Sequence, residues 1–339
     1  MEQSRKLSLL LLFCISIFIS SASWADPGQS SNSTFLAQAN ATTAPVSSQQ
    51  DVIESSANQS TSTKDLQPDN SSVPIGPEIP DWLKRTDYGA QVGTGETPSY
   101  YLETVQPLYQ SDDKVNTVFT HDRFSDDESG TFSGGLGYRR LLFDNNLMVG
   151  INSFFDYQDS YKEYRQGVGL EAITKTLEFR TNAYFDLSPK RVVSDDVDTT
   201  VFEKVVNGGD VEIGAPLPFI PWIKIFAGYQ RYAYHYASDL SGAEERVEFS
   251  PFKFATVNFV TSENVNGGTN YQMDGRVSLQ FEDFTLKSLR DMFSLAPTAY
   301  PDVDLTTRTL DRVERNFHIQ TERWSTNKTT GVTVEISRT

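Results

Sequence analysis

Cysteine, histidine and long apolar runs are all scarce in this sequence. Of its 339 residues, one is cysteine and three are histidine. With Cys14 alone, no disulfide can form within the chain, so packing and polar contacts must hold the fold. The mean hydropathy is −0.41, and past the first residues no segment is apolar enough for a transmembrane helix. A role within a membrane would therefore need β-strands, whose alternating pattern is invisible to hydropathy averaging.

Positive charge is also in deficit. Lys and Arg number 29 against 45 Asp and Glu, which gives a formal net charge of −16. A chain this acidic repels the phosphate backbone of nucleic acids, so the sequence predicts no nucleic acid among its partners.

Residues 1–25 read as a secretory signal peptide. Arg5 and Lys6 precede an apolar run at 7–19, and small residues lie at the −3 and −1 positions of a cleavage site after residue 25. The alternative is a membrane anchor, but the apolar run is shorter than the roughly 20 residues that a spanning helix needs. We therefore expect an exported protein from which this segment has been removed.

Residues 26–80 are rich in Ser, Thr, Asn, Gln and Ala and show no apolar periodicity. Such a composition cannot bury enough apolar surface to form a core. The sequence predicts a disordered polar spacer here, followed by a structured domain from residue 81.

Apolar and polar residues alternate from about residue 86 to residue 283, which is typical of strands with one apolar face. The stretch 177–187 is the clearest, because its odd positions are mostly apolar and its even positions include Glu178, Arg180 and Asn182. We count twelve such stretches in the chain. The expected fold is an all-β, antiparallel up-and-down transmembrane barrel of about twelve strands, spanning residues 81–283.

If the apolar faces contact lipid, the polar faces line a lumen. The alternation places nine polar side chains there: Arg139, Asn152, Asp156, Glu171, Glu178, Arg180, Asn182, Asp274 and Arg276. We expect a charge network that satisfies buried polar groups rather than a substrate filter. Gly135 and Gly137, on the same face, are expected to allow tight curvature or an inserted segment.

The connections between these stretches are short and long in turn. Residues 143–146 form a short one, and residues 188–207 form the longest. Membrane barrels show this pattern because tight turns lie in the periplasm and longer loops lie outside. A soluble β-sandwich also alternates polar and apolar faces. Stretches of about ten residues, aromatic residues near strand ends and both signs of charge on the polar face favour the membrane barrel.

The block GLGYRRLLFDNNLMVGINSFFDYQ and its continuation to residue 185 resemble the β-domain of inverse autotransporters, the group that contains intimin and invasin. The strands follow the family's order, with Gly-x-Gly-Tyr-Arg, then Gly-x-Asn-x-Phe-x-Asp, Gly-x-Glu and Asn-x-Tyr-Phe. Further similar motifs are Pro107-Leu108-Tyr109, Gly208 to Val211, Ala215 to Pro218, and Leu310 to Asn316 with Ile319. The resemblance covers about residues 86 to 324.

This resemblance implies an outer-membrane barrel whose C-terminal segment passes back through the lumen to the cell surface. Residues 284–295 (FTLKSLRDMFSL) have helical spacing, and in the family a helix or linker at this place plugs the pore. We therefore expect residues 284–339 to form a helix and linker within the lumen. The alternative is an ordinary amphipathic tail in the periplasm.

The resemblance also implies partners: the lipid bilayer, the barrel-assembly machinery, periplasmic chaperones and, through adhesion, a host-cell surface. Two departures limit what it carries over. Only about 45 residues follow the expected helix, too few for an immunoglobulin-like domain. In place of a peptidoglycan-binding module before the barrel stands the polar spacer. Binding of a host receptor by a passenger domain is therefore not predicted.

Chemistry-bearing motifs are weak. His235 with Asp239 suggests a barrel protease, but no matching acidic pair is found. The acidic run 195–198 lacks the glycine and distal glutamate of a calcium loop. The glycines at 135 and 137 lack the lysine and helix of a phosphate loop. The sequence predicts no enzyme, no cofactor and no metal site.

The sequence thus predicts the anchor and translocator of an inverse autotransporter in a bacterial outer membrane, with a periplasmic spacer and a surface-exposed tail. The alternative is a stand-alone structural barrel or small pore without an exported passenger. A third hypothesis is that the outer loops, chiefly residues 188–207, bind a host or phage surface.

Overall fold

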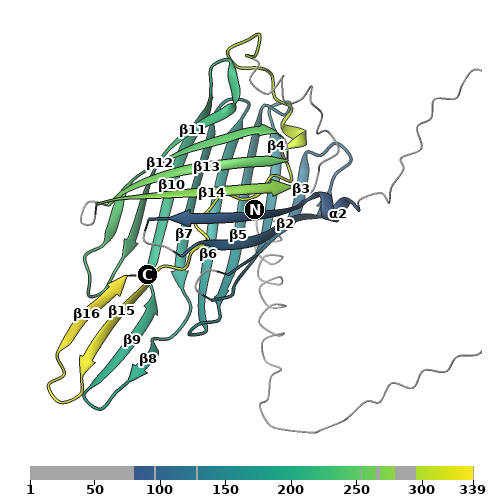
Figure 1. The fold of residues 1–339 in the computed structure, drawn as a ribbon. Helices are drawn as coiled ribbons and strands as arrows, with labels where there is room; N and C mark the ends of the chain where they lie inside the picture. Colours follow the sequence, from purple (N-terminus) through teal and green to yellow (C-terminus); the bar gives the residue numbers. More distant parts are fainter. Residues whose placement is uncertain are drawn as a thin grey trace, which may run out of the picture. The chain divides into compact units, whose positions relative to one another are not determined.

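The computed structural model describes residues 80–94, 97–126, 129–252, 254–264, 268–278 and 295–338. All lie in the compact unit Ser72–Thr339. The expected signal peptide and nearly all of the expected spacer lie outside the described residues. The described part begins with a single helical turn, α2 (Asp81–Lys84), and is otherwise dominated by strands (Figure 1). Within it, no helix has the length and apolar character needed to cross a membrane.

Twelve antiparallel strands form a closed barrel, as the alternation predicts (Figure 1). Each strand pairs with its neighbours in chain order, except that β7 pairs with β10, and β1 closes the barrel against β14. The barrel strands are β1 (Thr86–Gly93), β2 (Ser99–Gln110), β3 (Asn116–Ser125), β4 (Thr131–Leu142), β5 (Leu147–Gln158), β6 (Glu163–Thr174), β7 (Glu178–Asp186), β10 (Asn207–Leu217), β11 (Ile220–Ala233), β12 (Leu240–Phe252), β13 (Ala255–Asn264) and β14 (Gly268–Ser278).

Side chains alternate between the two faces of the barrel wall because successive residues of a strand point to opposite sides. The outward face is apolar. It includes Tyr88, Leu102, Phe132, Ile151, Phe155, Leu170, Phe179, Phe185, Ile213, Ile225, Phe259 and Met273, all of them exposed to the surroundings. The inward face carries buried charged and amide groups, described below. This distribution is the reverse of a soluble protein's and matches a barrel in lipid.

The two ends of the barrel differ. At one end, which we call the short-turn end, β4 and β5 are joined by residues 143–146, in which Phe143, Asp144 and Asn145 all have positive φ (54°, 54° and 61°). The connections at the other end, the long-loop end, include residues 187–206 between β7 and β10. The chain enters β1 and leaves β14 at the short-turn end, because the number of barrel strands is even.

The long connection expected at 188–207 does join two barrel strands, but it is not a plain loop, since it contains the hairpin β8 (Arg191–Asp195) and β9 (Thr199–Val205). The C-terminal residues were expected to be helix and linker, but they form β15 (Thr321–Asn327) and β16 (Thr333–Arg338). These four strands make a second sheet in the order β16-β15-β9-β8, which we call the outer sheet (Figure 1). The expected helix at 284–295 lies, apart from Leu295, outside the described residues.

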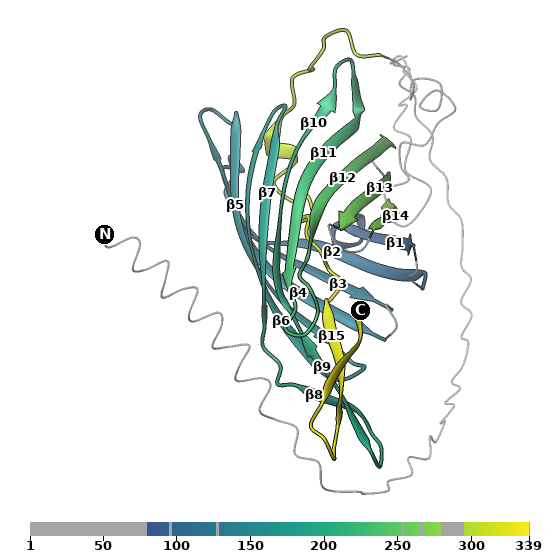
Figure 2. The same cartoon turned by 90° about the vertical axis from the view of Figure 1, so that its left-hand side faces the viewer.

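The chain reaches the outer sheet by passing along the inside of the barrel. Figure 2 shows the yellow C-terminal segment entering near the short-turn end and running inside the wall down to β15. It begins with the 3-10 helix η1 (Leu305–Thr307), whose N-terminus is capped by the side chain of Asp304, which accepts from the backbone N–H of Thr306. After it the chain makes a turn at residues 309–310 and then belongs to no strand until β15 begins at residue 321. We call residues 305–320 the lumenal segment.

Candidate functional site in the barrel lumen

Arginines from the barrel wall bind the backbone of the lumenal segment. Arg139 on β4 is fully buried, and one of its guanidinium nitrogens donates to the carbonyls of Thr309 (3.1 Å) and Asp311. Its other side is fixed by the carboxylate of Glu171 on β6, with an Nη2–Oε2 distance of 3.2 Å. Because the guanidinium is already oriented by this ion pair, it binds the passing carbonyls without further loss of side-chain freedom.

Arg165 on β6 repeats this arrangement nearer the long-loop end. Its Nη1 donates to the carbonyl of His318 (2.7 Å), its Nη2 donates to the carbonyl of Asn316 (2.9 Å), and its Nε donates to Asp156 (2.8 Å). Two arginine–carboxylate pairs of the wall therefore bind carbonyls at two places along the lumenal segment.

Asp156 is the wall carboxylate with the most direct contact to the lumenal segment. Besides Arg165, it accepts from both terminal nitrogens of Arg315, at 3.0 and 2.7 Å. The site is fully buried. On the neighbouring strand β6, a Cβ placed on Gly167 would lie 2.8 Å from Nη2 of Arg315, so the wall has no side chain where this arginine lies.

Main-chain and side-chain groups on either side of Arg315 are also bound. The backbone N–H of Asn316 donates to the hydroxyl of Tyr184 (2.8 Å), and its side-chain amide donates to the hydroxyl of Tyr232 (2.9 Å). The backbone N–H of Val313 donates to Nδ1 of His121 (3.2 Å). This contact requires the His121 proton on Nε2, which lies 3.2 Å from Oε1 of Glu103.

Two apolar clusters pack the same segment against the wall. Val313 packs with Val105, Phe119 and Phe154, and Leu310 and Phe317 cover this cluster. At the short-turn end, fully buried Leu305 packs with Leu141, Met148 and Ile173. The lumenal segment is thus bound through apolar contacts as well as through polar groups.

The opposite wall, from β7 to β13, is filled by its own ion pairs. Arg180 and Arg246 both bind Glu212, at 2.9 and 2.7 Å. Lys224 lies between Glu178 and Glu248, 3.1 Å from each. Glu178, Glu212 and Glu248 each have a cationic partner, which is the condition under which buried charges are tolerated.

The structure places the nine residues expected at the lumen as follows. The lumenal segment is in contact with the ion pairs of Asp156, Arg139 and Glu171. Glu178 also contacts it, because its carboxylate lies 2.9 Å from Nη1 of Arg308. Asn182 donates to Asp210 (2.7 Å) and to the carbonyl of Glu314 (3.3 Å). Asp274 accepts from Tyr101 (2.7 Å), and Arg276 lies 3.7 Å from Asp87. Arg180 belongs to the opposite wall, and Asn152 is buried on the inward face of β5.

Residues of the lumenal segment itself were missed as site residues. Arg308, Arg312 and Arg315 each bind carboxylates, and Arg312 lies between Glu314 (2.8 Å) and Glu103 (3.8 Å). The sequence did contain a signal for these residues: three arginines follow the last barrel strand, and the inward face of the barrel carries carboxylates that can pair with them.

The acidic groups considered for metal binding have cationic partners instead. Asp195 on β8 pairs with Lys328 (2.8 Å), and hydrogen bonds from Lys328 and Thr200 hold the pKa of this carboxyl below its usual range. Asp239 pairs with Arg231 (2.7 Å). Among the described residues, no cluster of three or more His, Cys, Asp or Glu could hold a metal ion.

Comparison with solved structures places the fold among membrane barrels. A solved chain described as "Unveiling the Mechanism Behind the in-meso Crystallization of Membrane Proteins" has a TM-score of 0.55 and 20% identity, covering 70% of this chain and 99% of that one. At this identity the likeness shows the fold alone. The chain therefore has the fold of a membrane β-barrel.

Sequence comparison gives the family. The model of the inverse autotransporter β-domain matches residues 37–317. Invasin of Yersinia enterocolitica is 28% identical over 203 residues, which are 58% of this chain and 24% of that protein. The inverse autotransporter adhesin YeeJ of Escherichia coli K12 is 31% identical over 159 residues, 45% of this chain and 6% of YeeJ. The chain belongs to the inverse autotransporter β-domain family and spans a quarter or less of these two relatives.

Proposed function

We propose that this barrel anchors itself in the bacterial outer membrane and carries its own C-terminal segment through its lumen to the cell surface. The observation that carries the proposal is the binding of backbone carbonyls in the lumenal segment by Arg139 and Arg165. Wall donors aimed at a backbone suit a pore that accommodates an extended chain. No catalytic activity is part of this proposal.

The proposal puts the long-loop end outside the cell. Short turns at one end and longer loops at the other are typical of outer-membrane barrels with the short turns in the periplasm. In that orientation the spacer expected at 26–80 is periplasmic, and the outer sheet lies at the cell surface.

The relatives suggest the purpose of this anchoring. The two relatives are named an invasin and an adhesin, and the outer sheet is the part of this chain from which an adhesive segment would extend. We propose the barrel-assembly machinery and periplasmic chaperones as partners during insertion, and a host-cell surface as the eventual target. These partners rest on the family and on the barrel fold.

The location of the C-terminus tests the proposal. Because Cys14 is the single cysteine, an epitope tag or a cysteine added after residue 339 gives a clean probe on intact cells. A tag that binds antibody, or a thiol that reacts with a membrane-impermeant reagent, is expected without lysis. Protection in intact cells with reactivity after lysis would refute export.

The alternative is a stand-alone barrel or small pore whose tail stays inside. This alternative predicts that the C-terminal tag is protected in intact cells and becomes reactive only after lysis. Conductance in planar bilayers separates the two further, because the lumenal segment packs against much of the wall. Deleting residues 305–339 is expected to raise single-channel conductance, with the heat-modifiable gel shift showing that the barrel still folds. Equal conductance in a folded deletion variant would contradict a plugging role.

A further inference from the structure

Beyond the lumen, the outer strand β15 is bound by the loops of the long-loop end. Its whole length pairs with β9, in the register Thr321↔Val205 to Asn327↔Thr199. The pairing continues at both ends, since the N–H of Val206 donates to the carbonyl of Gln320 (3.0 Å) and the N–H of Lys328 donates to the carbonyl of Asp198 (2.9 Å). Strand addition of this kind supplies affinity through the backbone.

A second set of contacts binds the side chain of Glu322. This carboxylate is only 2% exposed, and it accepts three backbone N–H groups from the loop between β11 and β12. The donors are His235 (2.9 Å), Tyr236 (2.7 Å) and Ala237 (2.8 Å). Successive N–H groups converging on one point form an anion-binding nest, and charge-assisted bonds of this kind are among the stronger hydrogen bonds.

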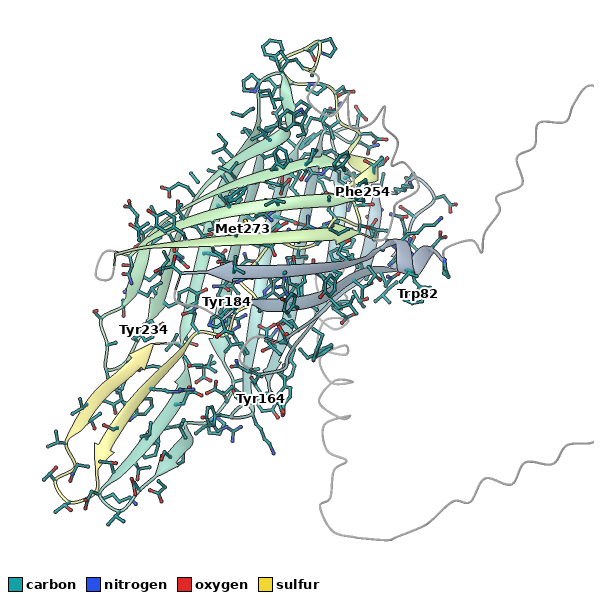
Figure 3. The ribbon with its side chains drawn as sticks, viewed as in Figure 1. Trp82, Tyr164, Tyr184, Tyr234, Phe254 and Met273 are labelled. Atoms are coloured by element: carbon teal, nitrogen blue, oxygen red, sulfur yellow. The ribbon has the colours of Figure 1, made fainter. Side chains whose placement is uncertain are left out.

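Trp324 lies on the same face as Glu322 because the two are two residues apart on a strand. Its indole is 5% exposed and packs against Tyr236 and Phe202, with ring centroids 4.9 and 5.8 Å away. Figure 3 shows Tyr234, at the start of the same loop, near the barrel end of the outer sheet. The loop therefore supplies both the nest and part of an aromatic pocket.

The other face of β15, which carries Thr321 and Arg323, is bound by a side chain of β9. Glu203 accepts from the hydroxyl of Thr321 (3.3 Å) and from Nε of Arg323. The guanidinium of Arg323 also lies 5.3 Å from the ring of Tyr161, in the loop after β5. Three loops of the barrel thus contact four consecutive side chains of the C-terminal segment.

We propose that these loops form a capture site for an extended strand with a Thr-Glu-Arg-Trp pattern, and that its occupant is residues 321–327 of this chain after they leave the lumen. The inference rests on the proposed function and adds to it the step that prevents return. Once Glu322 is in the nest and β15 is paired with β9, sliding back would separate both.

The site differs in kind from the lumen, which supports a retaining role. Arg139 and Arg165 bind carbonyls, which every residue carries, whereas the capture site selects a carboxylate and an indole at fixed positions. A segment therefore moves past the lumenal arginines in many registers but fits the capture site in one.

The test uses the full chain with cysteines at Val201 and Ser325, which lie directly opposite in the register. Oxidant added to intact cells is expected to join them, while the off-register pair of cysteines at Val201 and Asn327 should react poorly. The C-terminal tag is read out in the same cells. This experiment is repeated with Glu322→Gln, which keeps the shape but places a donor against the N–H groups of the nest.

The expected result is a several-fold loss of cross-linking in Glu322→Gln, with no loss in the control Glu263→Gln, an exposed glutamate at the same end of the barrel. Unchanged cross-linking in Glu322→Gln, with the tag still exposed, would overturn capture and leave export standing. A tag protected in the unsubstituted chain would instead overturn export itself.

If Glu322→Gln fails to assemble, Ala237→Pro gives a second test, because it removes one donor of the nest without changing the C-terminal segment. Loss of cross-linking with the heat-modifiable barrel intact supports capture. Undiminished cross-linking in that variant counts against it.

Discussion

The C-terminal segment is bound in two ways within a short length of chain. In the lumen, residues 305–319 belong to no strand, and side chains of the wall bind several of their carbonyls. At the long-loop end, residues 321–327 are paired with β9, and their own side chains are bound by loops. The wall arginines Arg139 and Arg165 therefore bind carbonyls that any residue carries, whereas the long-loop end binds the carboxylate of Glu322 and the indole of Trp324 as well as backbone. Substitutions in the two regions should differ in how far their effects spread.

The largest effect is expected from Asp156→Asn. This change leaves Arg165 and Arg315 without their shared buried carboxylate, and an unpaired buried charge costs about 3 kcal/mol or more. The cost falls on the whole barrel, because Asp156 links the wall to the lumenal segment. Urea titration of the heat-modifiable form measures it, with exposed Asp159→Asn as control. Equal midpoints for the two variants would show that the lumenal ion pairs add nothing.

Trp324→Ala should be nearly as costly but confined to the outer sheet. Removing a large buried aromatic costs about 3 kcal/mol, and its neighbours are Phe202 on β9 of the outer sheet and Tyr236 in the loop between β11 and β12. We expect faster amide hydrogen exchange in β15 and unchanged exchange in the barrel strands. Val332→Ala, in the exposed turn of the same hairpin, is the control. Faster exchange throughout the barrel would remove the distinction between the two regions.

Gly167→Ala tests the fit of the lumenal segment more gently. The added methyl group would meet Arg315 at 2.8 Å, whereas at Gly275 nothing lies within 4 Å. Overpacking of a filled site costs about 1 kcal/mol at the least. The urea midpoint of Gly167→Ala should therefore fall below that of Gly275→Ala. If the order is reversed, the wall at Gly167 is not in close contact with the segment.

Asp195→Asn should have the smallest effect, because its pair with Lys328 is exposed. The pKa of Asp195 is lowered in the folded protein, so its contribution is present above the ordinary Asp value of about 3.9 and is lost as pH falls through the lowered value. Hydrogen exchange of β15 should differ between Asp195→Asn and the parent near neutral pH, and this difference should vanish in strong acid. Exposed Asp198→Asn is the control; a difference that grows in acid would contradict the assignment.

The alternation of the sequence was sufficient to predict the barrel and the orientation of its wall residues. Successive residues of a strand point to opposite faces, so the apolar residues next to Arg180 and Asn182 in the sequence are enough to predict that these two side chains face inward. The partners of Arg139 in the lumenal segment could not be predicted in this way. They are the carbonyls of Thr309, Asp311 and Arg312, and every residue has a carbonyl whatever its side chain.

The outer sheet was missed for a different reason. Its strands lie in segments with many acidic, Ser and Thr residues, which resemble solvated loops, and the pairing of β9 with β15 joins parts of the chain more than a hundred residues apart. Yet Thr199-Thr200-Val201-Phe202 is rich in β-branched residues, as is Val332-Thr333-Val334. These two runs have a high β-propensity and could have predicted strands, but the acidic residues around them favoured the interpretation as loops.

The orientation of Arg139 and Arg165 toward carbonyls has a consequence for any other chain in the same pore. Carbonyls recur along an extended chain, and those on one side return about every 7 Å whatever the side chains are. A polypeptide shifted by two residues would present carbonyls to the same donors again, so the two arginines favour positions of the chain that differ by two residues. The resident segment is held at one of these positions by Val313, Arg315 and Asn316, whose contacts do not repeat.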